Sequence, residues 1–211
     1  MKYIKDFYLS VLAKVSYLIG LINWKTKQTL TVEDKDKISA LLKDNYYIIL
    51  TRHNGHLTAY AIDFAHWVLT RKSGYYGHAL LNFEDKVVTN DDFQFVESTI
   101  IGVHYSKFNE VFDQLCGSVA ILKPKSMKIE DWTTVVDKAR TELGKPYDLS
   151  LDVTTDDALD CVELVRDALK GEPNYATDYA NLEATIAKYK NLDPQMIYEC
   201  SDFEVVFEVR H

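Results

Sequence analysis

Apolar residues at helical spacing follow Cys161. Gly171 stands where a helix over this segment would end. Asp160 is a preferred N-cap residue, and Glu163, three positions later, completes an Asp-x-x-Glu capping box. The pattern therefore predicts a helix that begins at Cys161 and carries this cysteine in its first turn. The apolar positions of its buried stripe are Val162, Val165 and Leu169.

Period-two and period-3.6 patterns predict the remaining elements. Strands are expected at residues 46–51, 78–84, 86–89, 93–101, 119–122 and 203–209. Helices are expected at residues 57–70, at 129–143 before Gly144, and at 181–190. The strands between 78 and 101 are separated by short turns, which favours an antiparallel meander. Helices that are segregated from an antiparallel sheet make the predicted fold class α+β, with at least one helix packed across the sheet.

Composition limits the class of protein. A chain of 211 residues with 47% hydrophobic content can bury a good core, and it has no obvious linker, so residues 1–211 are expected to form a single domain. A net charge of −8 disfavours nucleic acid as a partner. Three widely spaced cysteines cannot all pair within the chain and form no CxxC pattern, which favours a reducing, cytoplasmic setting.

Residues 1–27 differ from the rest of the chain. They carry five lysines against Asp6, a balance of +4, and they are also the most apolar segment. Charged interruptions argue against a transmembrane helix, and no small-residue cleavage site of a signal peptide follows. Two interpretations remain open: a helix docked on the domain, or an interfacial helix that makes peripheral contact with a membrane.

The thiol of Cys161 is the first candidate for chemistry. The positive end of a helix favours a thiolate there, but the carboxylates of Asp160 and Glu163 oppose it, so a cationic histidine is needed as a partner. The alternative is a buried structural cysteine on an amphipathic helix, which is the commoner role of a free cysteine.

His78 is the strongest of the six histidines as that partner, because it follows Gly77 at the mouth of a predicted strand. His66 has the position of a packing residue, and His104 could line the site without an assigned step. His53 and His56 form an HxxH pair without a convincing third ligand, so no metal site is expected. His211 is terminal and is given no role.

Glu97 is the candidate third group of the site. A carboxylate within an apolar run is costly unless it has a partner, and an imidazolium is a suitable partner. The alternative is that Glu97 points to solvent from a half-buried strand. Glu84, Asp85 and Asp63 are weaker candidates for the same role.

Several motifs in order resemble one protein family. LGKPYD at 143–148 and DCVELV at 160–165 resemble the tyrosine-containing turn and the cysteine-bearing helix start of NlpC-type, papain-like cysteine hydrolases. The histidine and glutamate precede the cysteine here, which is the arrangement of the circularly permuted, YiiX-like branch. Four further segments resemble that branch: YYIILTRHNG, YYGHALLNFED, FQFVEST and IYECSDFEVVFE. The resemblance covers the chain from about residue 46 to its end.

The resemblance implies a permuted papain-like fold, in which an antiparallel sheet or partial barrel packs against the cysteine-bearing helix. It also implies Cys161 as nucleophile, His78 as general base and acid, Glu97 as the residue that orients the ring, and Tyr147 near the oxyanion side of the pocket. No metal or organic cofactor is required. Two departures are Val162, where the branch usually has serine, and a Tyr46-Tyr47 pair in place of Gly-Asp.

The expected function is a cysteine amidase or acyl hydrolase of lipid-like or acylated substrates. The basic, apolar segment 1–27 favours this class because it could bring the enzyme to an anionic bilayer. The runner-up is a peptidoglycan endopeptidase acting on cell-wall peptides. A third hypothesis is a non-catalytic lipid- or protein-binding module that retains the fold.

Overall fold

The structure is a computed structural model of the chain. It describes residues 28–43, 46–54, 57–82, 93–128, 131–148 and 157–211. The predicted strand at 86–89, the weaker candidates Glu84 and Asp85, and the segment 1–27 lie outside the described residues. None of the helices in the described part has the length and apolar character that crossing a bilayer requires.

A six-stranded antiparallel sheet forms the centre of the molecule, with the strand order β4-β3-β2-β1-β5-β6. The strands are β1 (Ile48–His53), β2 (His78–Asn82), β3 (Phe93–Thr99), β4 (Gly102–Lys107), β5 (Cys116–Pro124) and β6 (Phe203–Arg210). The sheet is open, with β4 and β6 at its edges, so within the described chain it does not close into a barrel. The predicted meander is confirmed for β2, β3 and β4, which pair as sequence neighbours.

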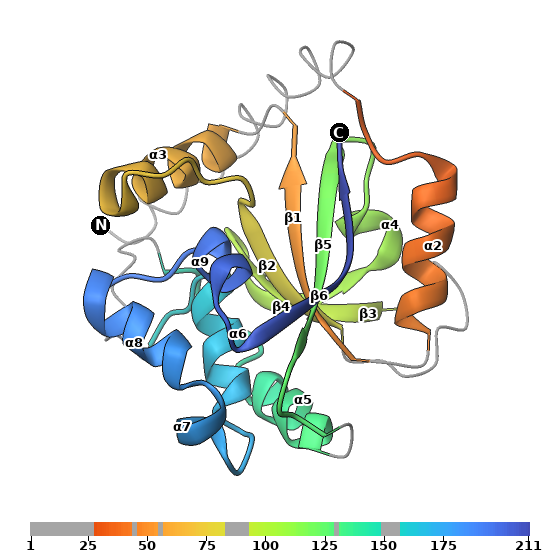
Figure 1. Ribbon diagram of the computed structural model, residues 1–211. Helices are drawn as coiled ribbons and strands as arrows, with labels where there is room; N and C mark the ends of the chain where they lie inside the picture. Colours follow the sequence, from red (N-terminus) through yellow and green to blue (C-terminus); the bar gives the residue numbers. More distant parts are fainter. Residues whose placement is uncertain (1–27, 44–45, 55–56, 83–92, 129–130, 149–156) are drawn as a thin grey trace.

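Helices cover both faces of the sheet (Figure 1). One face packs on α5 (Trp132–Thr141), α6 (Cys161–Leu169), α8 (Ala180–Tyr189) and α9 (Pro194–Glu199). The other face packs on α2 (Val32–Leu42) and the short α4 (Phe108–Val111). α3 (Leu57–Thr70) connects β1 to β2, and the one-turn α7 (Tyr175–Asp178) precedes α8.

Alternation along the strands explains the two layers. In β1, Ile48 and Leu50 belong to the core beneath α5 and α6, whereas Ile49 belongs to the core beneath α2. Residues 48–51 of β1 are buried because the strand has neighbours on both faces and on both edges. The α+β class predicted from the sequence is confirmed.

Gly102 shapes the turn between β3 and β4. The strand predicted to run to residue 101 ends at Thr99, and the chain reverses so that Gly102 has φ +97°. A Cβ atom built on Gly102 would lie 2.4 Å from the carbonyl oxygen of Lys145. The backbone of Val103 bonds to this same residue, with the Val103 N–H donating to the Lys145 carbonyl at 2.9 Å. Only glycine fits both the conformation and the close approach.

We expect Gly102→Ala to lower the free energy of unfolding by about 3 kcal/mol, because strain at positive φ adds to a clash with backbone. Gly144 is the matched control, since it has φ +82° but open space around its Cα. Gly144→Ala should cost only about 1 kcal/mol. Urea denaturation followed by circular dichroism measures both values, and equal losses would contradict the steric argument.

Candidate active site

The start of α6 is fixed by its capping box. The Asp160 carboxylate accepts hydrogen bonds from the N–H groups of Val162 and Glu163, both at 2.8 Å. In return the Glu163 carboxylate accepts from the Asp160 N–H at 2.8 Å. The helix begins at Cys161 and its thiol is buried, so the predicted position of this cysteine in the first turn is confirmed.

Gly171 follows the C-cap Lys170, as the sequence pattern predicts, but its role is packing. Its φ is not positive. A Cβ atom at this position would lie 2.6 Å from the Thr134 carbonyl oxygen. The glycine thus allows the end of α6 to approach the first turn of α5, which holds α6 against the sheet.

The register of β2 and β3 brings His78 to Glu97. Leu80 pairs with Glu97 across the two strands, so His78, two positions earlier, is the diagonal neighbour of the carboxylate. His78 Nε2 lies 2.6 Å from Glu97 Oε2. Glu97 is buried, which rules out the alternative that it simply points to solvent.

The thiol of Cys161 meets the same imidazole. α6 packs on β2 and β3, and the interaction with Cys161 is among the causes that raise the pKa of His78, so the two side chains are neighbours. Because Nε2 is engaged by Glu97, Nδ1 is the ring atom that faces the sulfur. Cys161, His78 and Glu97, predicted as one site from distant parts of the sequence, are therefore brought together.

The imidazole of His78 is stabilised in its charged form. Burial alone would lower the pKa of His78, but this effect is outweighed by hydrogen bonds and opposite charge from Cys161 and Glu97. The pKa of His78 is raised to about 10. At neutral pH the ring is an imidazolium, the form that stabilises a thiolate beside it.

Glu97 has partners on both sides. Burial would raise the pKa of Glu97, yet the bond to His78, the Ser106 hydroxyl and the charge of His104 lower it to about 2. The Ser106 hydroxyl donates to Oε1, and His104 Nε2 lies 3.6 Å from the same oxygen. The Nδ1 atom of His104 lies 2.9 Å from the Gly102 carbonyl.

Sequence reasoning missed Ser106. β4 was not predicted as a separate strand, so the pairing of Glu97 with His104 and of Phe95 with Ser106 had no basis. The alternation of Val103 and Tyr105 with His104 and Ser106 is the signal that would have revealed it.

Tyr147 lies on the cysteine side of the site. It is half-buried, and burial together with the negative charge of Cys161 and Asp160 raises the pKa of its phenol. The turn that carries it is tied to β4 through Gly144, whose N–H donates to the Val103 carbonyl at 2.9 Å. Tyr147 is thus a neutral hydroxyl near the thiol, and its expected place at the oxyanion remains a prediction.

Asp160 and Glu163 at the start of α6 carry less negative charge near neutral pH than two ordinary carboxylates would, so they repel a thiolate less strongly. Burial raises the pKa of Asp160 to about 6 against the hydrogen bonds that it accepts. Burial and the charge of Asp160 raise the pKa of Glu163 to about 8. Glu163 is therefore mostly neutral at pH 7, and the negative charge next to Cys161 is reduced.

The other histidines and cysteines lie outside this site. His53 Nε2 faces the Val111 carbonyl at 3.1 Å, and His66 Nδ1 binds Asp193 at 2.8 Å in the interior. His56 is not among the described residues. Burial raises the pKa of Cys200 to about 12 and that of Cys116 further. Within the described chain, no three His, Cys, Asp or Glu side chains are grouped so that they could hold a metal ion.

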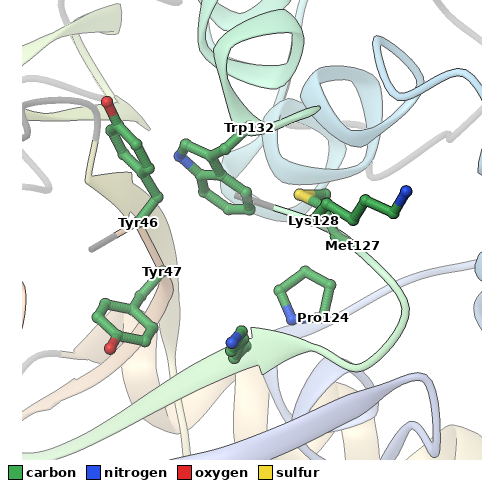
Figure 2. A pocket seen from close by; sticks show the side chains of 7 residues that line it. Tyr46, Tyr47, Pro124, Met127, Lys128 and Trp132 are labelled. Atoms are coloured by element: carbon green, nitrogen blue, oxygen red, sulfur yellow. The ribbon is translucent and has the colours of Figure 1, made fainter. Parts of the chain in front are cut away.

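The Tyr46-Tyr47 pair has a packing role. Figure 2 shows the side chains that line a small pocket between the start of β1 and α5. The pocket has a volume of about 20 Å³, which is room for about one water molecule. Tyr46 stacks on Trp132 with ring centroids 5.9 Å apart. Tyr46 thus joins the start of β1 to α5, whereas Tyr47 belongs to the core beneath α2. The lining residues are Tyr46, Tyr47, Lys123, Pro124, Met127, Lys128 and Trp132.

Comparison with known proteins gives one structural relationship. No protein-family model matches the chain, and no curated protein matches it in sequence. The structure is similar to the crystal structure of the metalloprotein yiiX from Escherichia coli O157:H7, DUF1105. The two share 14% sequence identity with a TM-score of 0.55, over 80% of this chain and 99% of the other. The YiiX-like relationship expected from the motifs is confirmed at the level of the fold.

Glu163 gives the protein a pH-dependent stability. Burial raises its folded-state pKa to about 8, from an ordinary value of 4.5, so its contribution to stability is fully present below pH 4.5 and is lost as the pH rises through 8. We expect the free energy of unfolding to fall between pH 5 and pH 9, and Glu163→Gln to flatten that decline. Urea titrations across this range measure it, and an unchanged slope in the variant would refute the assignment.

Proposed function

We propose that the protein is a cysteine hydrolase that cleaves amide or ester bonds of acylated substrates through Cys161, His78 and Glu97. The observation that supports this proposal is the position of the His78 imidazole. It lies beside the Cys161 thiol at the start of a helix, and its Nε2 atom is paired with the buried carboxylate of Glu97. This is the arrangement by which a nucleophile, a base and an orienting group act together.

The chemistry follows from the charges of the three groups. The Cys161 thiolate attacks the acyl carbonyl carbon, a C–S bond forms, and the carbonyl oxygen becomes an oxyanion. Asp160 occupies the N–H groups of Val162 and Glu163, and we assign the Cys161 N–H as a donor to the oxyanion. Tyr147 is assigned to the same side of the intermediate.

Collapse of the intermediate breaks the bond to the leaving group. The His78 imidazolium gives its proton to the departing amine or alcohol, which leaves a thioester on Cys161 and a neutral ring. Water then attacks the thioester and His78 takes its proton. The C–S bond breaks, the acid leaves, and the Cys161 thiolate is restored beside the His78 imidazolium. Glu97 keeps the ring in place throughout and stabilises its positive charge.

The class we propose is the circularly permuted branch of the NlpC-type, papain-like hydrolases. The order of His78 and Glu97 before Cys161 supports it, as do the motifs around them and the likeness of the fold to yiiX. The neighbour is described as a metalloprotein. Because the described residues offer no three-donor group, no step is assigned to a metal here.

Lipid-like or acylated molecules are the substrates we propose. The support is the composition of segment 1–27, whose lysines and apolar residues suit the surface of an anionic bilayer. Cell-wall peptides are the second candidate class, and a binding module without catalysis is the third. The two experiments that follow separate these possibilities.

We expect iodoacetamide to label Cys161 faster than the other cysteines at neutral pH, because the His78 imidazolium lies beside its thiol. Cys116 and Cys200 are internal controls, since burial raises both of their pKa values. Mass spectrometry of peptides labelled across pH 5–10 gives the rate at each cysteine. His78→Asn should slow the labelling of Cys161, because it removes the cationic neighbour of the thiol. An inert Cys161 would instead support the binding module.

For turnover, we expect Cys161→Ala and His78→Asn to lower kcat on a fluorogenic fatty-acyl amide by at least about 10³-fold, because both take part in each step. Glu97→Gln should cost less, because it acts through the ring. His53→Asn is the matched control and should keep full activity. Release of cell-wall peptides without release of fatty acid would favour the endopeptidase.

A further inference from the structure

α3 has a buried side and an exposed apolar side. On the buried side His66 binds Asp193, which also caps α9 by accepting from the Met196 N–H at 2.9 Å. On the other side the exposed fractions of Phe64, Trp67 and Val68 are 65%, 46% and 45%. The proposed reaction uses none of these three residues.

The exposed residues form one continuous stripe, which we call the α3 face: Phe64, Trp67 and Val68. Their positions i, i+3 and i+4 lie on the same side of a helix. Phe64 and Trp67 stack with ring centroids 6.0 Å apart. α3 lies at the periphery of the molecule, to one side of the end of β1 (Figure 1). A clustered aromatic patch at such a position marks a contact surface.

Cationic groups border the α3 face. The Arg71 guanidinium lies over the Trp67 ring at 5.2 Å, and Lys72 next to it is largely exposed, where it pairs with Glu199 at 3.3 Å. Segment 1–27, with its charge of +4, joins the described chain at Gln28. The carbonyl of Gln28 accepts from the Asn54 side chain at 2.8 Å, and Asn54 stands three residues before α3.

These charges decide what covers the α3 face. Segment 1–27 is one candidate cover by sequence, but its lysines would repel Arg71 and Lys72, so the charges disfavour the segment as a cover. An anionic surface attracts both sets of cations although the chain as a whole is acidic. Tryptophan beside arginine suits the boundary between lipid headgroups and acyl chains, because the ring is amphipathic and the cation reaches outward.

We propose that the α3 face docks the protein on an anionic lipid bilayer, with Phe64 and Trp67 inserted at the headgroup level and Arg71 and Lys72 at the phosphates. This goes beyond the proposed function, since docking requires no turnover. It would bring the proposed site close to the bilayer, because the segment 71–77 connects α3 to β2 and its first residue, His78.

The test is cosedimentation of the full chain with vesicles of phosphatidylcholine and phosphatidylglycerol, and with vesicles of phosphatidylcholine alone. We expect binding to the anionic vesicles that weakens at high salt. A Phe64→Ser, Trp67→Ser double variant should bind at least about tenfold more weakly. The matched control is Val32→Ser, because Val32 is apolar and 77% exposed on α2, away from the patch. It should bind as the parent protein does.

Thermal unfolding establishes that each variant is folded. If the double variant is not folded, the single variants Phe64→Ser and Trp67→Ser replace it in the binding assay. Equal binding by parent and double variant, or no binding by the parent, would overturn the proposal; the former result would point to segment 1–27 alone. Self-association that the double variant abolishes would point to a second copy and also overturn it. Cys161→Ala should bind vesicles normally, which separates a failure of docking from a failure of catalysis.

Discussion

The buried carboxylate of Glu97 is the constraint on which the site depends. A charge removed from water costs several kcal/mol unless it is paired and hydrogen-bonded. The sheet supplies those partners from the strands on both sides of β3: His78 from β2, and His104 and Ser106 from β4. The bond that the Glu97 carboxylate requires from His78 also fixes the orientation of the His78 ring.

The helix contributes the opposite half of the site. Its capping box places the sulfur in the first turn, and the close approach of α5 and α6 at Gly171 holds the helix on the sheet. Burial has a useful consequence here. By keeping Glu163 largely protonated, it removes a negative charge that would otherwise disfavour a thiolate. The start of α6 and the Glu97 side of the sheet meet at the His78 imidazole, which interacts with Cys161 and with Glu97.

How far the sequence predicts this arrangement depends on whether a signal is local. The start of α6 follows from residues within four positions of each other, and His78 and Glu97 lie in strands with clear apolar patterns. β4 was missed because its strand is short and the turn at Gly102 depends on a contact with distant Lys145. Ser106 was missed with it. Helix α2 was missed because it buries little more than Ile38 and Leu42 among charged residues.

The wide separation of the site residues along the chain has a consequence for how the protein matures. The imidazole and the sulfur meet only through contacts of high contact order, after α6 has docked on β2 and β3. Until then Cys161 lacks its cationic neighbour. If Cys161 is the nucleophile that we propose, a nascent or misfolded chain has no complete catalytic group, and the group assembles only with the finished tertiary structure.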